Sequence, residues 1–265
     1  MKQSITLGQY LPGESFLHRL NPRFKLLSLA LVLVTLFFVK TLGGMGLFLA
    51  LLILFSILVR MPYSYLLRGL KPIFYIVIFT LIIYLFFTKG GAVLLRLGPI
   101  TVEEAGVIQG AFVVGRLIAL VLASILVTLT TTPLALTHGL EFFLTPLKLI
   151  RVPVAEITMI MTIALRFIPT LMEESRRLML AQMARGADFE TGNLFRKARN
   201  LTPLIVPLFV SAFRRADELA VAMEARGYRI GARRTRMREE TVSWRDWVAL
   251  AASGALLAAV IIAGI

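Results

Sequence analysis

The sequence predicts an all-α polytopic membrane protein with about five transmembrane helices and a cytoplasmic module of long crossing helices. Two observations support this fold class. Hydrophobic residues make up 58% of the 265 positions, and several uncharged runs approach or reach the length that a bilayer requires. Most of the 29 lysines and arginines lie between residues 141 and 246, so a charged part of the chain is separate from the apolar part.

Five apolar blocks are the expected spans, each measured against the roughly 20 residues that a helix needs to cross a bilayer. They cover residues 26–39, 41–59, 72–88, about 105–132 and 248–265. The first block is short, so we expect the Lys25 and Lys40 side chains to reach outward to opposite interfaces. No cleavable signal peptide is expected, because mostly polar residues precede the first block and no small-residue cleavage pattern follows it.

Residues 154–171 are apolar enough to suggest another span, but they contain Glu156 and Arg166. Each charge would cost about 2.5 to 3.5 kcal/mol at a bilayer centre. We therefore expect no clean span here. The segment instead continues into a charged stretch and predicts one long helix that grazes the membrane and leaves it.

Two more helical elements are expected in the charged part of the chain. Residues 133–153 form a shorter amphipathic piece. Residues 201–213 are too short to cross a bilayer and also run into a charged stretch, with Thr202 and Pro203 as a helix cap and first-turn pair. This third element repeats the design of the long helix before it.

Cationic loops alternate along the chain, and this alternation predicts its orientation, because loops rich in lysine and arginine stay in the cytoplasm. We expect a cytoplasmic amino terminus, cytoplasmic residues 133–245 and an external carboxyl terminus. Trp244 and Trp247 fit the inner interface, where the last span begins. The expected organisation is transmembrane helices in residues 1–132, cytoplasmic helices in 133–240 and the last transmembrane helix in 241–265.

Two identical triplets end the two charged helical segments. They are Ala184, Arg185, Gly186 and Ala225, Arg226, Gly227. Arginine in a last turn complements the helix dipole and glycine supplies a left-handed cap, so a single triplet is explained as helix punctuation. The repetition in related surroundings (RRLMLAQMARG and RRADELAVAMEARG) favours two matching receptors. Alanine keeps each tip thin, arginine offers a forked donor to a carboxylate, and glycine turns the chain away.

Five motifs occur in order along nearly the whole chain: HRLNPRFKLL, TLTTTPLAL, FFLTPLKLIRVP, IALRFIPTLMEE and the paired triplets. Together they resemble the transmembrane T component of energy-coupling factor transporters, which are ABC-type importers of vitamins and transition-metal ions. The resemblance implies that the two tips dock into grooves on two cytoplasmic ATPase subunits. It also implies that the membrane helices hold a separate substrate-binding S component.

The residues also exclude several kinds of chemistry. No G-x-x-x-x-G-K-[ST] motif is present, so we expect no catalytic residue here and assign ATP hydrolysis to partner subunits. The chain has no cysteine and only two histidines, which excludes thiolate metal sites and disfavours any other transition-metal site. We therefore expect a non-catalytic subunit without a cofactor or bound metal.

Arg116 interrupts the fourth apolar block and is a possible structural or functional intramembrane charge. We favour a structural role, in which it faces a protein-lined interior. Gly106 and Gly110 form a G-x-x-x-G pattern that allows close helix packing, within this chain or against the S component. Packing within the chain is the favoured interpretation.

Three other functions fit these residues less well: nucleic-acid binding, lipid modification and secondary transport. The basic segment 228–240 precedes a span directly, so we interpret it as an anchor for anionic lipid headgroups and expect no nucleic-acid binding. The alternative is a stand-alone membrane protein with this lipid-binding region. A lipid-modifying enzyme would need clustered acids or histidines at the interface, where this sequence has only isolated acids. A secondary transporter would need paired halves with broken helices in the membrane, whereas the repeat seen here lies in the expected cytoplasmic helices.

Overall fold

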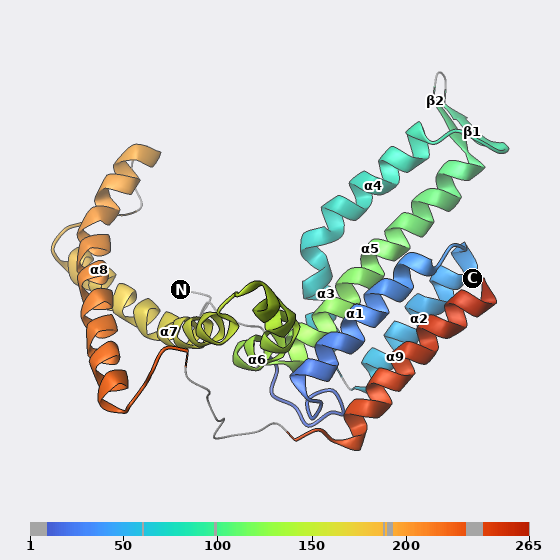
Figure 1. The fold of residues 1–265 in the computed structure, drawn as a ribbon. Coiled ribbons are helices and arrows are strands. Elements are labelled where there is room, and N and C mark those ends of the chain that lie inside the picture. The colour runs from blue at the N-terminus through green and yellow to red at the C-terminus, as the bar shows by residue number, and fades with distance from the viewer. Residues whose placement is uncertain are drawn as a thin grey trace. The chain divides into compact units, whose positions relative to one another are not determined.

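The computed structural model describes residues 10–59, 61–97, 100–187, 189, 193–231 and 241–264. The chain forms two compact units, one of Met1–Phe142 with Glu240–Ile265 and one of Phe143–Glu239. Both units are built of helices, with one two-stranded sheet among the described residues (Figure 1). The expected all-α polytopic fold class is thereby confirmed.

The first unit holds the shorter helices and the hairpin. In chain order its elements are α1 (Pro22–Phe38), α2 (Leu42–Leu58), α3 (Tyr63–Leu70), η1 (Lys71–Ile73), α4 (Phe74–Phe87), β1 (Val93–Leu97), β2 (Ile100–Glu103), α5 (Glu104–Thr130) and α9 (Trp244–Ala263). Helix α6 (Pro133–Leu144) starts in this unit. The strands are antiparallel, with Val93 opposite Glu103 and Leu97 opposite Ile100.

Local sequence signals explain where these helices begin. Asn21 caps α1 by accepting a hydrogen bond from the Arg23 amide, and Pro22 occupies the first turn, where its missing N–H costs nothing. Thr41 caps α2 through the Gly44 amide. Ser243 and Asp246 form a reciprocal capping box at the start of α9.

Helix α5 lies at the centre of the first unit and packs against α1, α2, α3 and α4, while α1 also packs along α9. Gly106 and Gly110 allow the contact with α4. A Cβ atom at Gly106 would lie 2.7 Å from the Tyr84 carbonyl oxygen, and one at Gly110 would lie 3.1 Å from the Tyr84 Cβ. The two glycines therefore serve packing within the chain, as we favoured.

Lys25 differs from its expected position. Its side chain is 3% exposed, and its Nζ donates hydrogen bonds to the Thr130 carbonyl oxygen at 3.0 Å and to the Thr131 Oγ1 at 2.9 Å. The prediction that it reaches outward was wrong, because these acceptors at the end of α5 satisfy the ammonium group inside the unit. Lys40, in contrast, is exposed.

Four described helical stretches are long and apolar enough to cross a membrane: Tyr63–Phe87, Glu104–Thr130, Val154–Ala184 and Trp244–Ala263. The expected third span thus starts earlier, because α3, η1 and α4 form one helical stretch. The helices of the first two expected blocks have only 17 residues each. Val154–Ala184 also qualifies by length and composition, so the case against a span there rests on the cost of Glu156 and Arg166 alone.

The second unit contains the two long helices. Its described elements are η2 (Thr145–Ile150), α7 (Val154–Ala184) and α8 (Leu194–Ala225). Helix α7 runs through Pro169 without interruption, which confirms the single long helix expected there. The piece expected at 133–153 is divided into α6 and η2.

Helix α8 begins earlier than the sequence suggested. Asn193 is its N-cap position, and both Pro203 and Pro207 lie inside it, so the prediction of Thr202 and Pro203 as a cap and first-turn pair was wrong. Each internal proline lacks the N–H that would bond to the carbonyl four residues before it. Since the two prolines are four residues apart, both missing hydrogen bonds fall on one side of the helix, and the other side continues unbroken.

Candidate functional site

The first triplet closes α7 with a defined backbone turn. Arg185 is the C-cap residue, and Gly186 adopts a left-handed conformation with φ of 88°. The Gly186 amide donates to the Met183 carbonyl and the Ala187 amide donates to the Gln182 carbonyl, both at 3.0 Å. This pair of hydrogen bonds is a Schellman motif, in which the last carbonyls of the helix find backbone donors.

The second triplet closes α8 in the same way. Arg226 is the C-cap residue, and Gly227 has a φ of 78°. The Gly227 amide donates to the Glu224 carbonyl at 2.9 Å, and the Tyr228 amide donates to the Met223 carbonyl at 3.0 Å. The repeated letters therefore produce a repeated backbone geometry, with both arginines at the same position of the cap.

All six residues of the two triplets are exposed. Among the described residues, no atom lies within 4 Å of a Cβ atom built on Gly186 or Gly227. Glycine is needed at these positions for its left-handed backbone and not for lack of space.

The guanidinium groups of the two tip arginines are not needed for the helix caps and can bind a group outside the helices. Backbone amides satisfy the helix carbonyls, so the caps do not depend on the guanidinium groups. Within the described residues, neither Arg185 nor Arg226 forms a salt bridge. A guanidinium stays charged and presents its donors in a planar fork that fits a carboxylate.

Arg116 is placed at the end of another helix. Its Nη2 donates to the carbonyl oxygen of Val39, the C-cap residue of α1, at 3.2 Å. Its guanidinium also lies 4.7 Å from the Phe112 ring centroid and 5.8 Å from that of Phe37. A cation at the negative end of a helix dipole and over aromatic faces is well accommodated, which favours a structural role.

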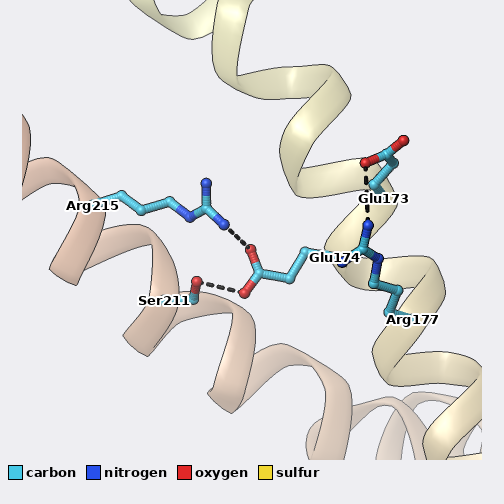
Figure 2. Close-up of polar contacts among 5 residues, drawn as sticks. All are labelled: Glu173, Glu174, Arg177, Ser211 and Arg215. Atoms are coloured by element: carbon cyan, nitrogen blue, oxygen red, sulfur yellow. Dashed lines mark hydrogen bonds and ion pairs between the residues drawn. The ribbon is translucent and has the colours of Figure 1, made fainter.

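A polar cluster at the crossing of α7 and α8 was missed by sequence reasoning (Figure 2). Glu174 of α7 accepts hydrogen bonds from Ser211 and Arg215 of α8. One signal could have found it: Glu174 and Arg215 are 41 residues apart, the same separation as the two tip arginines. Pairs at equivalent positions of a repeated design are candidates for contact where the two copies cross.

Other ligand chemistry has little support in the described residues. They contain no group of three or more histidine, cysteine or acidic side chains that could hold a metal ion. The basic segment 228–240, expected to contact lipid headgroups, lies mostly outside the described residues. The paired tips are therefore the site with the clearest geometry.

The fold and these tips define a helical multi-pass membrane protein with two exposed arginine tips of the same backbone geometry. Residues 13–237 match the model of the CbiQ family, described as cobalt transport protein, and the chain belongs to this family. This match and the relatives below confirm the resemblance drawn from the sequence.

Three relatives share nearly the full length of the chain, and each is named energy-coupling factor transporter transmembrane protein EcfT. The protein of Brevibacillus brevis is 50% identical over 248 residues, which cover 94% of either chain. That of Clostridium kluyveri is 50% identical over 251 residues, covering 94% of this chain and 93% of the relative. The Bacillus subtilis protein is 46% identical over 250 residues, 93% of either chain.

Proposed function

We propose that the protein is the transmembrane coupling subunit of an energy-coupling factor importer. In this role it transmits the ATP-driven motion of two cytoplasmic ATPase subunits to a membrane-embedded S component, which takes up a vitamin or a transition-metal ion. Family membership and the names of the relatives support the class of transporter. The observation that carries the proposal is the pair of exposed arginine tips with identical caps.

Each tip is suited to receive force from a partner. Its arginine offers a forked, charged donor to a carboxylate in a groove, and its glycine turns the following chain out of the way. The helices behind the tips have 31 and 32 residues, so each forms a rod of about 47 Å. A displacement imposed at one end of such a rod reaches its other end without a flexible loop between.

The same proposal assigns the remaining roles. The chain itself is non-catalytic, because its sequence lacks the glycine-rich loop that cradles nucleotide phosphates. Residues 133–240 form the cytoplasmic coupling module, and the amino terminus is cytoplasmic, as the distribution of lysine and arginine favours. The protein resides in the cell membrane of a prokaryote.

Coexpression tests this function directly. The chain is produced with candidate ATPase and S-component genes from its own organism, extracted in detergent, and purified by a tag on this chain alone. The proposal predicts a stable complex of fixed stoichiometry in which only the ATPase subunits bind nucleotide. A chain that purifies alone and is active in transport without partners would overturn it.

A further inference from the structure

Glu174 joins the two tip helices through both of its carboxylate oxygens (Figure 2). Oε2 accepts a charge-assisted hydrogen bond from Arg215 Nη2 at 3.0 Å, and Oε1 accepts the Ser211 hydroxyl at 2.5 Å. Ser211 and Arg215 are four residues apart and so lie on one face of α8. One side chain of α7 therefore holds one face of α8 at two points.

The position of this contact follows the repeat that ends in the tips. Glu174 and Arg215 are 41 residues apart, as are Arg185 and Arg226. Each member of the pair lies eleven residues before its tip arginine, which is about 16 Å along a helix. The two helices thus cross at equivalent residues, with the tips equally far from the crossing.

This placement is what a local twofold relation between the two helices requires, because equivalent residues meet at a twofold axis. In an exact repeat the residues at such an axis would be identical, and like charges there would repel. Here one copy supplies a carboxylate and the other a guanidinium. Because α7 and α8 differ in sequence, oppositely charged side chains meet at the crossing. Two helices of identical sequence could not place such a pair there.

Apolar side chains at the crossing are only partly buried. Among the described residues, none is fully buried from 159 to 187 in and after α7, nor from 205 to 231 in and after α8. An open groove of about 680 Å³ lies beside Arg215, lined by apolar residues that include Phe167, Leu171 and Leu219. Without a filled apolar core, directional contacts decide where along their lengths the helices cross.

We propose that Glu174 is the positioning residue that fixes the crossing of α7 and α8, so that the two tips move as one lever. The inference rests on the proposed coupling function of the tips. With the crossing fixed, displacement of one tip changes the position of the other by a set amount. When the crossing can slide, the helices shift independently and the motion of the ATPase subunits is lost before it reaches the membrane.

Glu173 provides a matched control one residue away. Its ion pair with Arg177 lies within α7, at 3.8 Å, and the two side chains are 76% and 82% exposed. Glu173→Gln therefore removes the same charge from the same helix without touching the crossing. Arg214 is likewise an exposed neighbour of Arg215 and serves as the control on α8.

The distance between the tips is the first measurement. The chain has no cysteine, so Ala181→Cys and Ala222→Cys introduce two unique labelling sites at equivalent, exposed positions of the repeat. Spin labels at these two positions report the distance between the tips by pulsed electron paramagnetic resonance spectroscopy of the full complex. We expect a narrow distribution in the parent and in Glu173→Gln, a broader or shifted one in Glu174→Gln, and recovery in the exchanged pair Glu174→Arg with Arg215→Glu.

Uptake per ATP hydrolysed is the second measurement, made on the same complexes reconstituted in vesicles. Glu174→Gln should lower this ratio several-fold at unchanged complex assembly, and the exchanged pair should recover it. Equal tip distances in the Glu174→Gln and Glu173→Gln complexes would overturn the inference. An altered tip distance in Glu174→Gln with a normal uptake per ATP hydrolysed would also overturn it. Failure of the coupling function itself is separate, because it would appear as normal uptake when both Arg185 and Arg226 are replaced.

Discussion

At the scale of single residues, the two tip glycines explain why each helix ends where it does. Both Gly186 and Gly227 adopt positive φ angles, and no atom of the part of the chain that the structure describes lies within 4 Å of where a Cβ would stand. An alanine would therefore strain the backbone without a steric clash. The consequence of replacing them is confined to the turn that presents each arginine.

Gly186→Ala and Gly227→Ala should each destabilise the tip turn by about 1 to 2 kcal/mol, while asparagine, which tolerates the left-handed region, should cost less. Hydrogen exchange of the peptide around each tip measures this, with faster exchange expected for alanine than for asparagine. Gly254→Ala, in a helix interior with nothing within 4 Å, is the control. Equal exchange in the alanine and parent proteins would refute the strain.

Lysine should replace Arg185 or Arg226 poorly. A charge-assisted hydrogen bond contributes about 1.5 to 3 kcal/mol, and lysine keeps the charge but lacks the planar fork that holds a carboxylate at two points. We expect uptake by Arg185→Lys and Arg226→Lys complexes to fall between that of the parent and that of the alanine variants, closer to alanine. Full activity with lysine would show that charge alone suffices.

The ends of α7 and α8 could be predicted because their signals are local: a charged helical segment, an arginine and a glycine. Prediction from the sequence failed at Lys25, whose acceptors Thr130 and Thr131 are more than 100 residues away in the chain. Glu174 was missed for the same reason, since its role depends on the crossing with α8. Contacts made in tertiary structure leave weak traces in a single sequence.

At the scale of elements, α4 and α5 approach each other closely because Gly106 has no side chain. Gly106→Ala should lower the thermal stability of the purified protein, since its Cβ would lie 2.7 Å from the Tyr84 carbonyl oxygen and such overpacking costs about 1 to 3 kcal/mol. Gly254→Ala should leave it unchanged or raise it, because helix interiors favour alanine. Thermal unfolding in detergent compares them, and equal midpoints for Gly106→Ala and the parent would contradict this packing.

The helices themselves could be predicted more accurately than their ends. The long apolar runs gave α5 and α9, and the continuous α7 followed from the absence of a strong breaker other than Pro169. The start of α8 was misplaced because a Thr-Pro pair is a strong first-turn signal, yet here Pro203 lies in the interior. The helix starts before that pair and continues through both prolines despite the hydrogen bonds lost there.

At the scale of the whole molecule, the distribution of lysine and arginine predicts the topology. A tag fused after Ile265 should be cut by protease added to unlysed cells whose cell wall and any outer membrane have been removed. A tag inserted directly after the exposed Gly186 should be cut only after lysis. The reverse pattern, with the carboxyl-terminal tag protected until lysis, would contradict the expected orientation.

The proposed coupling function requires that force enters the protein at the two tips. Uptake of substrate by the assembled complex, at matched expression, tests this most directly in Arg185→Ala, Arg226→Ala and the double variant, with the exposed Arg177→Ala as control. Loss of one arginine also leaves a partner carboxylate unpaired, so we predict weakened uptake in each single variant, abolished uptake in the double variant and normal uptake in the control. Near-normal uptake by the double variant would show that the two triplets are helix caps and nothing more.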